Sequence, residues 1–124
     1  MNRVDPKGWV GLVAAVLVAL AASGCDNARK QECSQFLGAM KPLDEGTPSA
    51  DTVDSVSKQV AAMKFQDQPL GVYATNYGKT LTVLSSTLKL KASGSAPDGT
   101  DDVIKKNLKE ARTDKEDVQR YCSQ

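Results

Sequence analysis

The feature that most constrains the fold is an apolar stripe in the middle of the chain, because its members recur at helical intervals. They step by four, four, three and four residues, at Tyr73, Tyr77, Leu81, Leu84 and Leu88. This spacing places them on one side of an α-helix that packs against neighbours. Threonine is frequent in the same segment and lowers its helix propensity, and residues 80–90 also alternate as a strand would. The longer stripe favours the helix.

Two shorter stripes precede it. The first begins near Gln31 and ends before Pro42. Its apolar positions are Cys33, Phe36, Leu37 and Met40. In the second, Thr47 has the character of an N-cap and Pro48 that of the first helical residue, and the helix is expected to run to about Phe65. Its apolar positions are Val53, Val56, Val60 and Met63.

A fourth helix is predicted after Thr100, which would act as its N-cap. Residues 101–102 are aspartates in the first turn, where the helix dipole favours negative charge. Lys115 falls where an apolar residue would continue the stripe, and residues 113–116 have the pattern of a capping box, so the helix either continues or breaks after Arg112. The stripe itself consists of Ile104, Leu108, Ala111, Val118 and Cys122.

Four helices with short connections favour antiparallel neighbours. The predicted fold class is therefore all-α: a small antiparallel (up-down-up-down) four-helix bundle in residues 33–124. The alternative is a three-helix domain or a pair of helical hairpins.

The first 24 residues differ in composition from the rest. Arg3 and Lys7 give a basic start, residues 9–22 are apolar and uncharged, and small residues then lead to Cys25. A charged start, a short apolar core and a small-residue exit are typical of a secretory signal peptide. A retained membrane span is the weaker alternative, because a spanning helix needs about 20 apolar residues.

The segment Ala22-Ser23-Gly24-Cys25 resembles the lipobox of bacterial lipoproteins. The resemblance implies that Cys25 is lipidated, that residues 1–24 are removed, and that fatty acyl chains such as palmitate anchor the new N-terminus in a membrane. Residues 25–32 would then be a lipidated tether. Asp26 resembles the residue that retains some Gram-negative lipoproteins in the inner membrane, facing the periplasm. Ordinary secretion without lipid is the alternative.

With Cys25 lipidated, the remaining cysteines are Cys33 and Cys122, near the two ends of the predicted bundle. Disulfides persist outside the cytoplasm, and a small core usually needs such a cross-link. Each cysteine is in phase with the apolar stripe of its helix, and the predicted topology brings the two to the same end. A Cys33–Cys122 disulfide is expected, and two free buried thiols are the alternative.

Charge and composition restrict the function. The chain has 16 Lys+Arg and 15 Asp+Glu, without the basic blocks that neutralise phosphates, so nucleic acid is not an expected partner. It has no histidine, which rules out Ser-His-Asp and Cys-His catalysis and histidine metal sites. We expect no metal, no cofactor and no enzymatic activity.

Two groups of residues remain as candidate contacts. The first is a polar-aromatic face made of Tyr73, Asn76 and Tyr77, which belongs either to the bundle core or to a contact with a ligand or partner. The second is a basic group on the fourth helix, which either faces solvent or approaches anionic lipid headgroups. Its members are Lys105, Lys106, Lys109 and Arg112.

These observations favour a membrane-anchored lipoprotein that acts outside the cytoplasm as a non-catalytic interaction or structural module of the cell envelope. The expected partner is another envelope protein. The alternative function is a carrier or sensor of a small apolar ligand in the bundle core, with Tyr73 and Tyr77 near the mouth.

Overall fold

The computed structural model describes residues 25–124, and this part of the chain is all-α. It contains four α-helices and one short 3-10 helix: α2 (Cys25–Met40), η1 (Lys41–Leu43), α3 (Ala50–Ala62), α4 (Gln68–Ala92) and α5 (Thr100–Cys122). The prediction of an all-α fold is confirmed, and the strand alternative for residues 80–90 is wrong. The predicted signal peptide, residues 1–24, lies outside the described residues.

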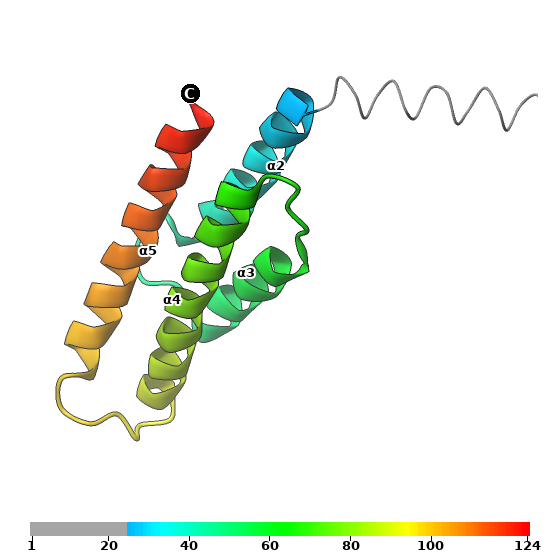
Figure 1. Cartoon of the computed structure of the whole chain (residues 1–124). Helices are drawn as coiled ribbons and strands as arrows, with labels where there is room; N and C mark the ends of the chain where they lie inside the picture. The colour runs from blue at the N-terminus through cyan, green and yellow to red at the C-terminus, as the bar shows by residue number, and fades with distance from the viewer. Residues whose placement is uncertain (1–24) are drawn as a thin grey trace, which may run out of the picture.

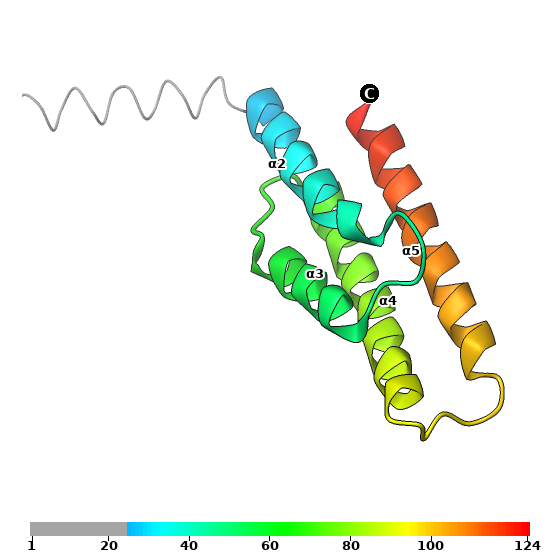
Figure 2. The ribbon, with the colours of Figure 1, turned by 180° about the vertical axis from the view of Figure 1, so that it is seen from behind.

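The two longest helices form the frame of the domain. α4 and α5 lie side by side and run in opposite directions, joined by the loop of residues 93–99 (Figure 1). The shorter α3 packs obliquely on α4, and α2 packs mainly on α5 (Figure 2). Both views place the start of α2 and the C-terminus at the same end of the molecule, which we call the disulfide end.

The core is formed where the four apolar stripes meet. Its largest fully buried side chains are Tyr77, Phe36, Met40, Leu70, Leu81, Leu84, Val53 and Val118. Phe36 lies at the centre, with its ring centroid 5.4 Å from that of Phe65 and 5.9 Å from that of Tyr77 in an edge-on arrangement. Such tilted and edge-on pairs are favourable because the ring edge of one meets the negative face of the other.

Threonines in α4 are accommodated by bonds within the helix. The hydroxyls of Thr75 and Thr82 donate to the carbonyl oxygens of Gly71 and Gly78 at 3.0 Å and 2.9 Å. Two further threonines make the same bond to the carbonyl four residues earlier. This arrangement satisfies each hydroxyl without interrupting the helix, and it explains why α4 is helical despite its composition.

Three predicted helix ends are wrong. α2 begins at Cys25 and not near Gln31, so residues 25–32, predicted as a tether, are helical. The N-cap of α3 is Ser49 and not Thr47. The hydroxyl of Ser49 accepts a hydrogen bond from the backbone N–H of Thr52 at 3.2 Å, and serine offers the same kind of capping oxygen as threonine. At its other end, α3 stops at Ala62, before Phe65.

α5 begins differently from its prediction, and it decides between the two alternatives that the sequence left open after Arg112. Its N-cap is Gly99, with φ of 89°, a left-handed conformation that glycine adopts without strain, and not Thr100. The helix continues through residues 113–116 without a break. Lys115 is tolerated on the inward side because its ammonium group lies 2.6 Å from the carboxylate of Asp44, with only 13% of the lysine side chain exposed.

Candidate functional site

A disulfide links the first described helix to the last. Cys33 on α2 and Cys122 at the end of α5 are bonded, with their Cα atoms 5.9 Å apart. The predicted Cys33–Cys122 bridge is confirmed. It closes a sequence separation of 89 residues, and cross-links of such long loops remove much entropy from the unfolded chain.

Arg29 adds a second connection at the disulfide end. Its guanidinium donates to the backbone oxygens of Tyr121 and Gln124 at 2.8 Å and 3.0 Å. It also lies 4.7 Å from the centre of the Tyr121 ring, within the range of a cation–π interaction. One side chain of α2 therefore binds two backbone oxygens at and just beyond the end of α5.

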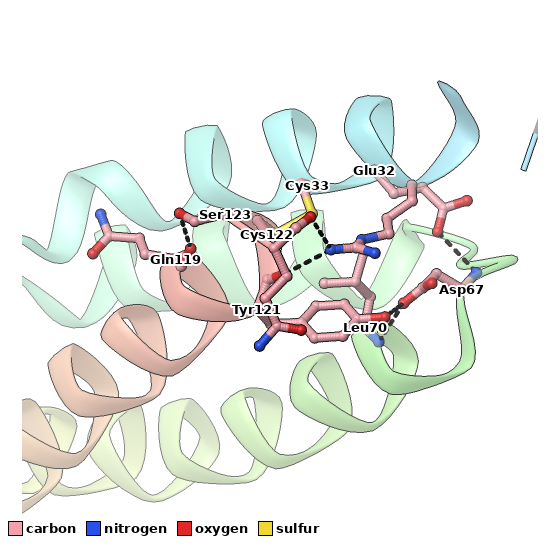
Figure 3. The surroundings of a disulfide bond; sticks show 10 residues. Glu32, Cys33, Asp67, Leu70, Gln119, Tyr121, Cys122 and Ser123 are labelled. Carbon is pink, nitrogen blue, oxygen red and sulfur yellow. Dashed lines mark hydrogen bonds between the residues drawn. A yellow bond between two sulfur atoms is a disulfide. The ribbon is translucent and has the colours of Figure 1, made fainter. Parts of the chain in front are cut away.

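Glu32 fixes the connection between α3 and α4. Its carboxylate is almost fully buried and accepts hydrogen bonds from the backbone N–H groups of Gln66 and Asp67, at 3.0 Å and 3.1 Å. Asp67 in turn caps α4 by accepting from the N–H of Leu70 at 3.2 Å. It also accepts from the hydroxyl of Tyr121 at 2.8 Å (Figure 3), and this bond raises the pKa of Tyr121. One hydrogen-bond network therefore joins α2, the connection between α3 and α4, the start of α4, and the end of α5.

Sequence reasoning missed this network. Glu32 and Asp67 are 35 residues apart, and no local pattern relates a carboxylate on one helix to the backbone of a distant turn. The only signal was at Asp67, where an aspartate followed by Pro69 is typical of a helix start.

The structure does not bring Tyr73, Asn76 and Tyr77 together on one surface. Tyr77 is 1% exposed and belongs to the core, where burial raises the pKa of its hydroxyl well above the ordinary value. Tyr73 is half-buried, with its ring centroid 5.8 Å from that of Tyr121. Asn76 is exposed on the outer side of α4. The interpretation of these residues as one contact face is not supported by their positions.

The four members of the basic group on α5 also differ in their surroundings. Arg112 is engaged in the fold, since its guanidinium donates to the backbone oxygens of Leu43 and Gly46 at 3.2 Å and 2.6 Å. Lys105, Lys106 and Lys109 are exposed. Lys105 lies 17 residues before Cys122, about 25 Å along the helix axis from the disulfide end, so this group is remote from Cys25.

An open groove runs along the outer surface between α3 and α4, with a volume of about 540 Å³. Its apolar part comes from both helices and the connection between them: Val60, Ala61, Met63, Phe65 and Ala74. Its α4 rim consists of Gly71, Thr75, Gly78, Lys79 and Thr82. We call this surface the α3–α4 groove. It was not predicted, because it depends on the oblique packing of α3.

A second, shallower hollow of about 380 Å³ continues the α3–α4 groove toward the disulfide end. It shares Phe65, Gly71 and Thr75 with the groove, and it adds Val72. Val72 is 55% exposed, the most exposed large apolar side chain in the described part of the chain. Together the two hollows follow α4 from Gln68 to Thr82.

The groove has a well-defined hydrogen-bond link beside it. The buried hydroxyl of Ser85 donates to the carboxylate of Asp54 on α3, whose other oxygen lies 2.9 Å from the ammonium group of Lys89. These two contacts lower the pKa of Asp54. They hold α3 against α4 and so keep the groove walls in place.

Within residues 25–124, no set of three acidic, cysteine or histidine side chains is placed to hold a metal ion. None of the described helices combines the length and hydropathy needed to cross a bilayer. Comparisons of the chain with protein-family models, curated proteins and solved structures find no significant match.

Proposed function

We propose that the protein is a bacterial lipoprotein, anchored by Cys25 to a membrane of the cell envelope, whose helical bundle serves as a non-catalytic interaction module. One observation carries the anchor: the disulfide uses Cys33 and Cys122, two of the three cysteines in the chain. The third is Cys25, the cysteine of the lipobox-like segment. Lipidation of Cys25 would account for its not being part of the disulfide. A structural disulfide also agrees with a location outside the cytoplasm.

The position of Cys25 supports a defined placement of the bundle. Cys25 is the first residue of α2, and the start of α2 lies at the disulfide end (Figure 1). With residues 25–32 helical, the lipid is joined to the bundle without a flexible spacer. We take the four helices as an up-down-up-down bundle that stands on the membrane with its disulfide end toward the bilayer. Two or three acyl chains hold such a protein firmly.

The lipid anchor is tested by Cys25→Ser, compared with a variant in which Cys33 and Cys122 are both serine. Cys25→Ser is expected to release the protein from membranes, and mass spectrometry of the wild-type N-terminal peptide is expected to show a diacylglycerol on Cys25. The double variant is expected to stay membrane-bound. A Cys25→Ser protein that remains on salt-washed membranes would contradict the anchor.

Interaction with another envelope protein is supported by the α3–α4 groove, an open apolar surface on the side of the bundle. The test is isolation of the lipidated wild-type protein from gently solubilised envelopes, with a stoichiometric partner as the expected result. A protein recovered alone would contradict the interaction module.

Retention in the inner membrane is proposed from Asp26. Replacement by serine is expected to move the lipidated protein to the outer-membrane fraction of a density gradient. An unchanged distribution would contradict the role of Asp26 while leaving the anchor intact.

The alternative function, a carrier of a small apolar ligand, placed Tyr77 near the mouth of a binding site. The position of Tyr77 does not support this placement, because its ring is buried against Phe36.

A further inference from the structure

We propose that the α3–α4 groove binds an amphipathic helix of a partner envelope protein, and that a carboxylate of this helix pairs with Lys79. The inference rests on the proposed interaction function and assigns it to one surface and one class of partner. Its basis is the shape of the groove, the pattern of residues along its rim, and its distribution of charge.

The shape of the groove suits a helix. Together with the adjoining hollow, it follows α4 from Gln68 to Thr82, a length of about 21 Å at the rise of an α-helix. It lies open on the surface with an apolar floor that includes Met63 and Phe65. Sites for small molecules usually enclose most of their ligand, whereas an amphipathic helix lays one face in a long open groove.

The rim of the groove repeats every seven residues. Gly71 and Gly78 are seven apart, as are Thr75 and Thr82, and all four line the groove. Residues seven apart lie on the same side of a helix, so these four small residues form one continuous rim along α4. The threonine hydroxyls already donate to the carbonyls of the two glycines, so their single donors are not left for a polar ligand.

Gly78 is a small residue that the bundle itself does not require. A Cβ atom built at this position would meet no other atom within 4 Å, and glycine in mid-helix lowers the stability of the helix. Its φ is not positive. The missing side chain leaves room on the groove side of α4, which is what a second backbone needs for close approach.

Charge indicates the chemistry of the partner. Of the described residues that line the groove, Lys79 is the only charged one, and it forms no salt bridge with any residue between 25 and 124. An apolar helix face with one aspartate or glutamate at the right height complements this surface. Such a pair would fix the register of the helix and disfavour uncharged competitors.

A second copy of this chain fits the groove less well. Two copies anchored through Cys25 in the same membrane would stand in the same direction, so a symmetric pairing through α4 would bring Lys79 close to the partner's Lys79. Like charges in such a position disfavour association. A different protein with an acidic residue avoids this conflict.

The test uses the full lipidated protein in its native envelope, with a photoreactive amino acid placed at Thr75 or Thr82, both exposed on the groove rim. The matched control places it at Lys106, exposed on α5. We expect both groove positions, and not the control, to cross-link to one segment of one protein. That segment is expected to have apolar residues at helical spacing and an acidic residue among them. Cross-linking to lipid, cross-linking to a second copy, or the absence of any cross-linked product would each overturn the proposal.

Charge reversal tests the role of Lys79. Lys79→Glu is expected to lower the cross-linking yield at least tenfold, and replacing the acidic residue of the cross-linked segment by lysine is expected to restore it. A yield unaffected by Lys79→Glu would overturn the assigned pairing.

A steric test compares Gly78→Leu with Gly38→Leu. Gly38 is exposed in α2, and a Cβ there also meets nothing within 4 Å, so both variants are expected to fold and circular dichroism verifies this. Gly78→Leu is expected to lower the yield at least tenfold and Gly38→Leu to leave it unchanged. If Gly78→Leu still holds a stoichiometric partner, the groove assignment fails while the interaction module stands. If no partner accompanies the wild type, the proposed function itself fails.

Discussion

Glu32 Oε1 accepts a hydrogen bond from the backbone N–H of Asp67 at 3.1 Å, across 35 residues of sequence. The other oxygen of the same carboxylate accepts from the N–H of Gln66 at 3.0 Å. A buried carboxylate that accepts two N–H groups stabilises a turn that would otherwise leave both donors without partners. The start of α4 is therefore held by a residue of α2.

We expect Glu32→Ala to lower the free energy of unfolding by about 1–3 kcal/mol, because it leaves two N–H groups without their acceptor. Urea denaturation followed by circular dichroism provides the measurement. Glu45→Ala is the control, because Glu45 is exposed and surface substitutions usually change stability by less than about 0.5 kcal/mol. Equal effects of the two substitutions would contradict the structural role of Glu32.

Loss of the disulfide is expected to lower the stability of the oxidised protein by about 2–5 kcal/mol. The variant with alanine at both Cys33 and Cys122 tests this in urea denaturation. A reducing agent is expected to destabilise the wild type by a similar amount and to leave this variant unchanged. A wild type insensitive to reduction would show that the bridge contributes little.

Asp114 and Asp54 are expected to change stability with pH in opposite directions. Burial, with the nearby charges of Glu110 and Asp117, raises the pKa of Asp114. A carboxyl whose folded pKa lies above its unfolded pKa stabilises the fold fully below the unfolded pKa, and this contribution is lost as the pH rises through the folded pKa. Asp114→Asn is therefore expected to unfold at higher urea concentration than the wild type near neutral pH, with the difference vanishing in acid.

For Asp54, the hydrogen bond from Ser85 and the contact with Lys89 lower the pKa. Its contribution to stability is present above the unfolded pKa and is lost as the pH falls through the folded pKa. Asp54→Asn is thus expected to be less stable than the wild type near neutral pH and equal to it in strong acid. Urea midpoints of both variants and the wild type, measured from neutral to acidic pH, would show whether each substitution raises or lowers stability.

Gly78→Ala and Gly38→Ala are each expected to raise the free energy of unfolding by about 0.4–1 kcal/mol, since alanine reduces the freedom of the unfolded chain and favours the helix. Neither added Cβ would meet another atom within 4 Å. Gly99→Ala is expected to destabilise the protein, because its φ of 89° strains any residue with a Cβ. Thermal unfolding of the three variants measures these differences.

The helices of the bundle were predictable because their signal is local. The stripe that contains Leu81 and Leu84 correctly predicted that α4 is a helix and which of its sides is buried, and both leucines are fully buried. The ends were less predictable, since Thr47 and Ser49 both offer a capping oxygen and the local sequence does not decide between them. The inward position of Lys115 in α5 involves Asp44, a distant residue with which it pairs and which no local pattern identifies.

The bridge was the part of the candidate site that sequence could supply, because the phase of Cys33 and Cys122 in their helices was visible. The α3–α4 groove was not, since its walls come from two helices whose crossing angle no local pattern records. The alternatives for Tyr73, Asn76 and Tyr77 stayed open for a related reason. Residues three and four apart share a side of a helix, but only the packing of neighbours decides that Tyr77 is inside and Asn76 outside.

Because α2 is helical from Cys25 onward, a lipid on Cys25, as proposed, would be joined to the bundle at a defined angle. Each residue of an α-helix turns the chain by about 100° and advances it by about 1.5 Å. One alanine inserted after Asn27, ahead of Arg29 and Cys33 and their contacts, would therefore lift the bundle only slightly. It would, however, rotate the α3–α4 groove by more than a quarter of a turn relative to Cys25. The number of residues between Cys25 and the bridge would thus set the angle between the proposed lipid and the groove.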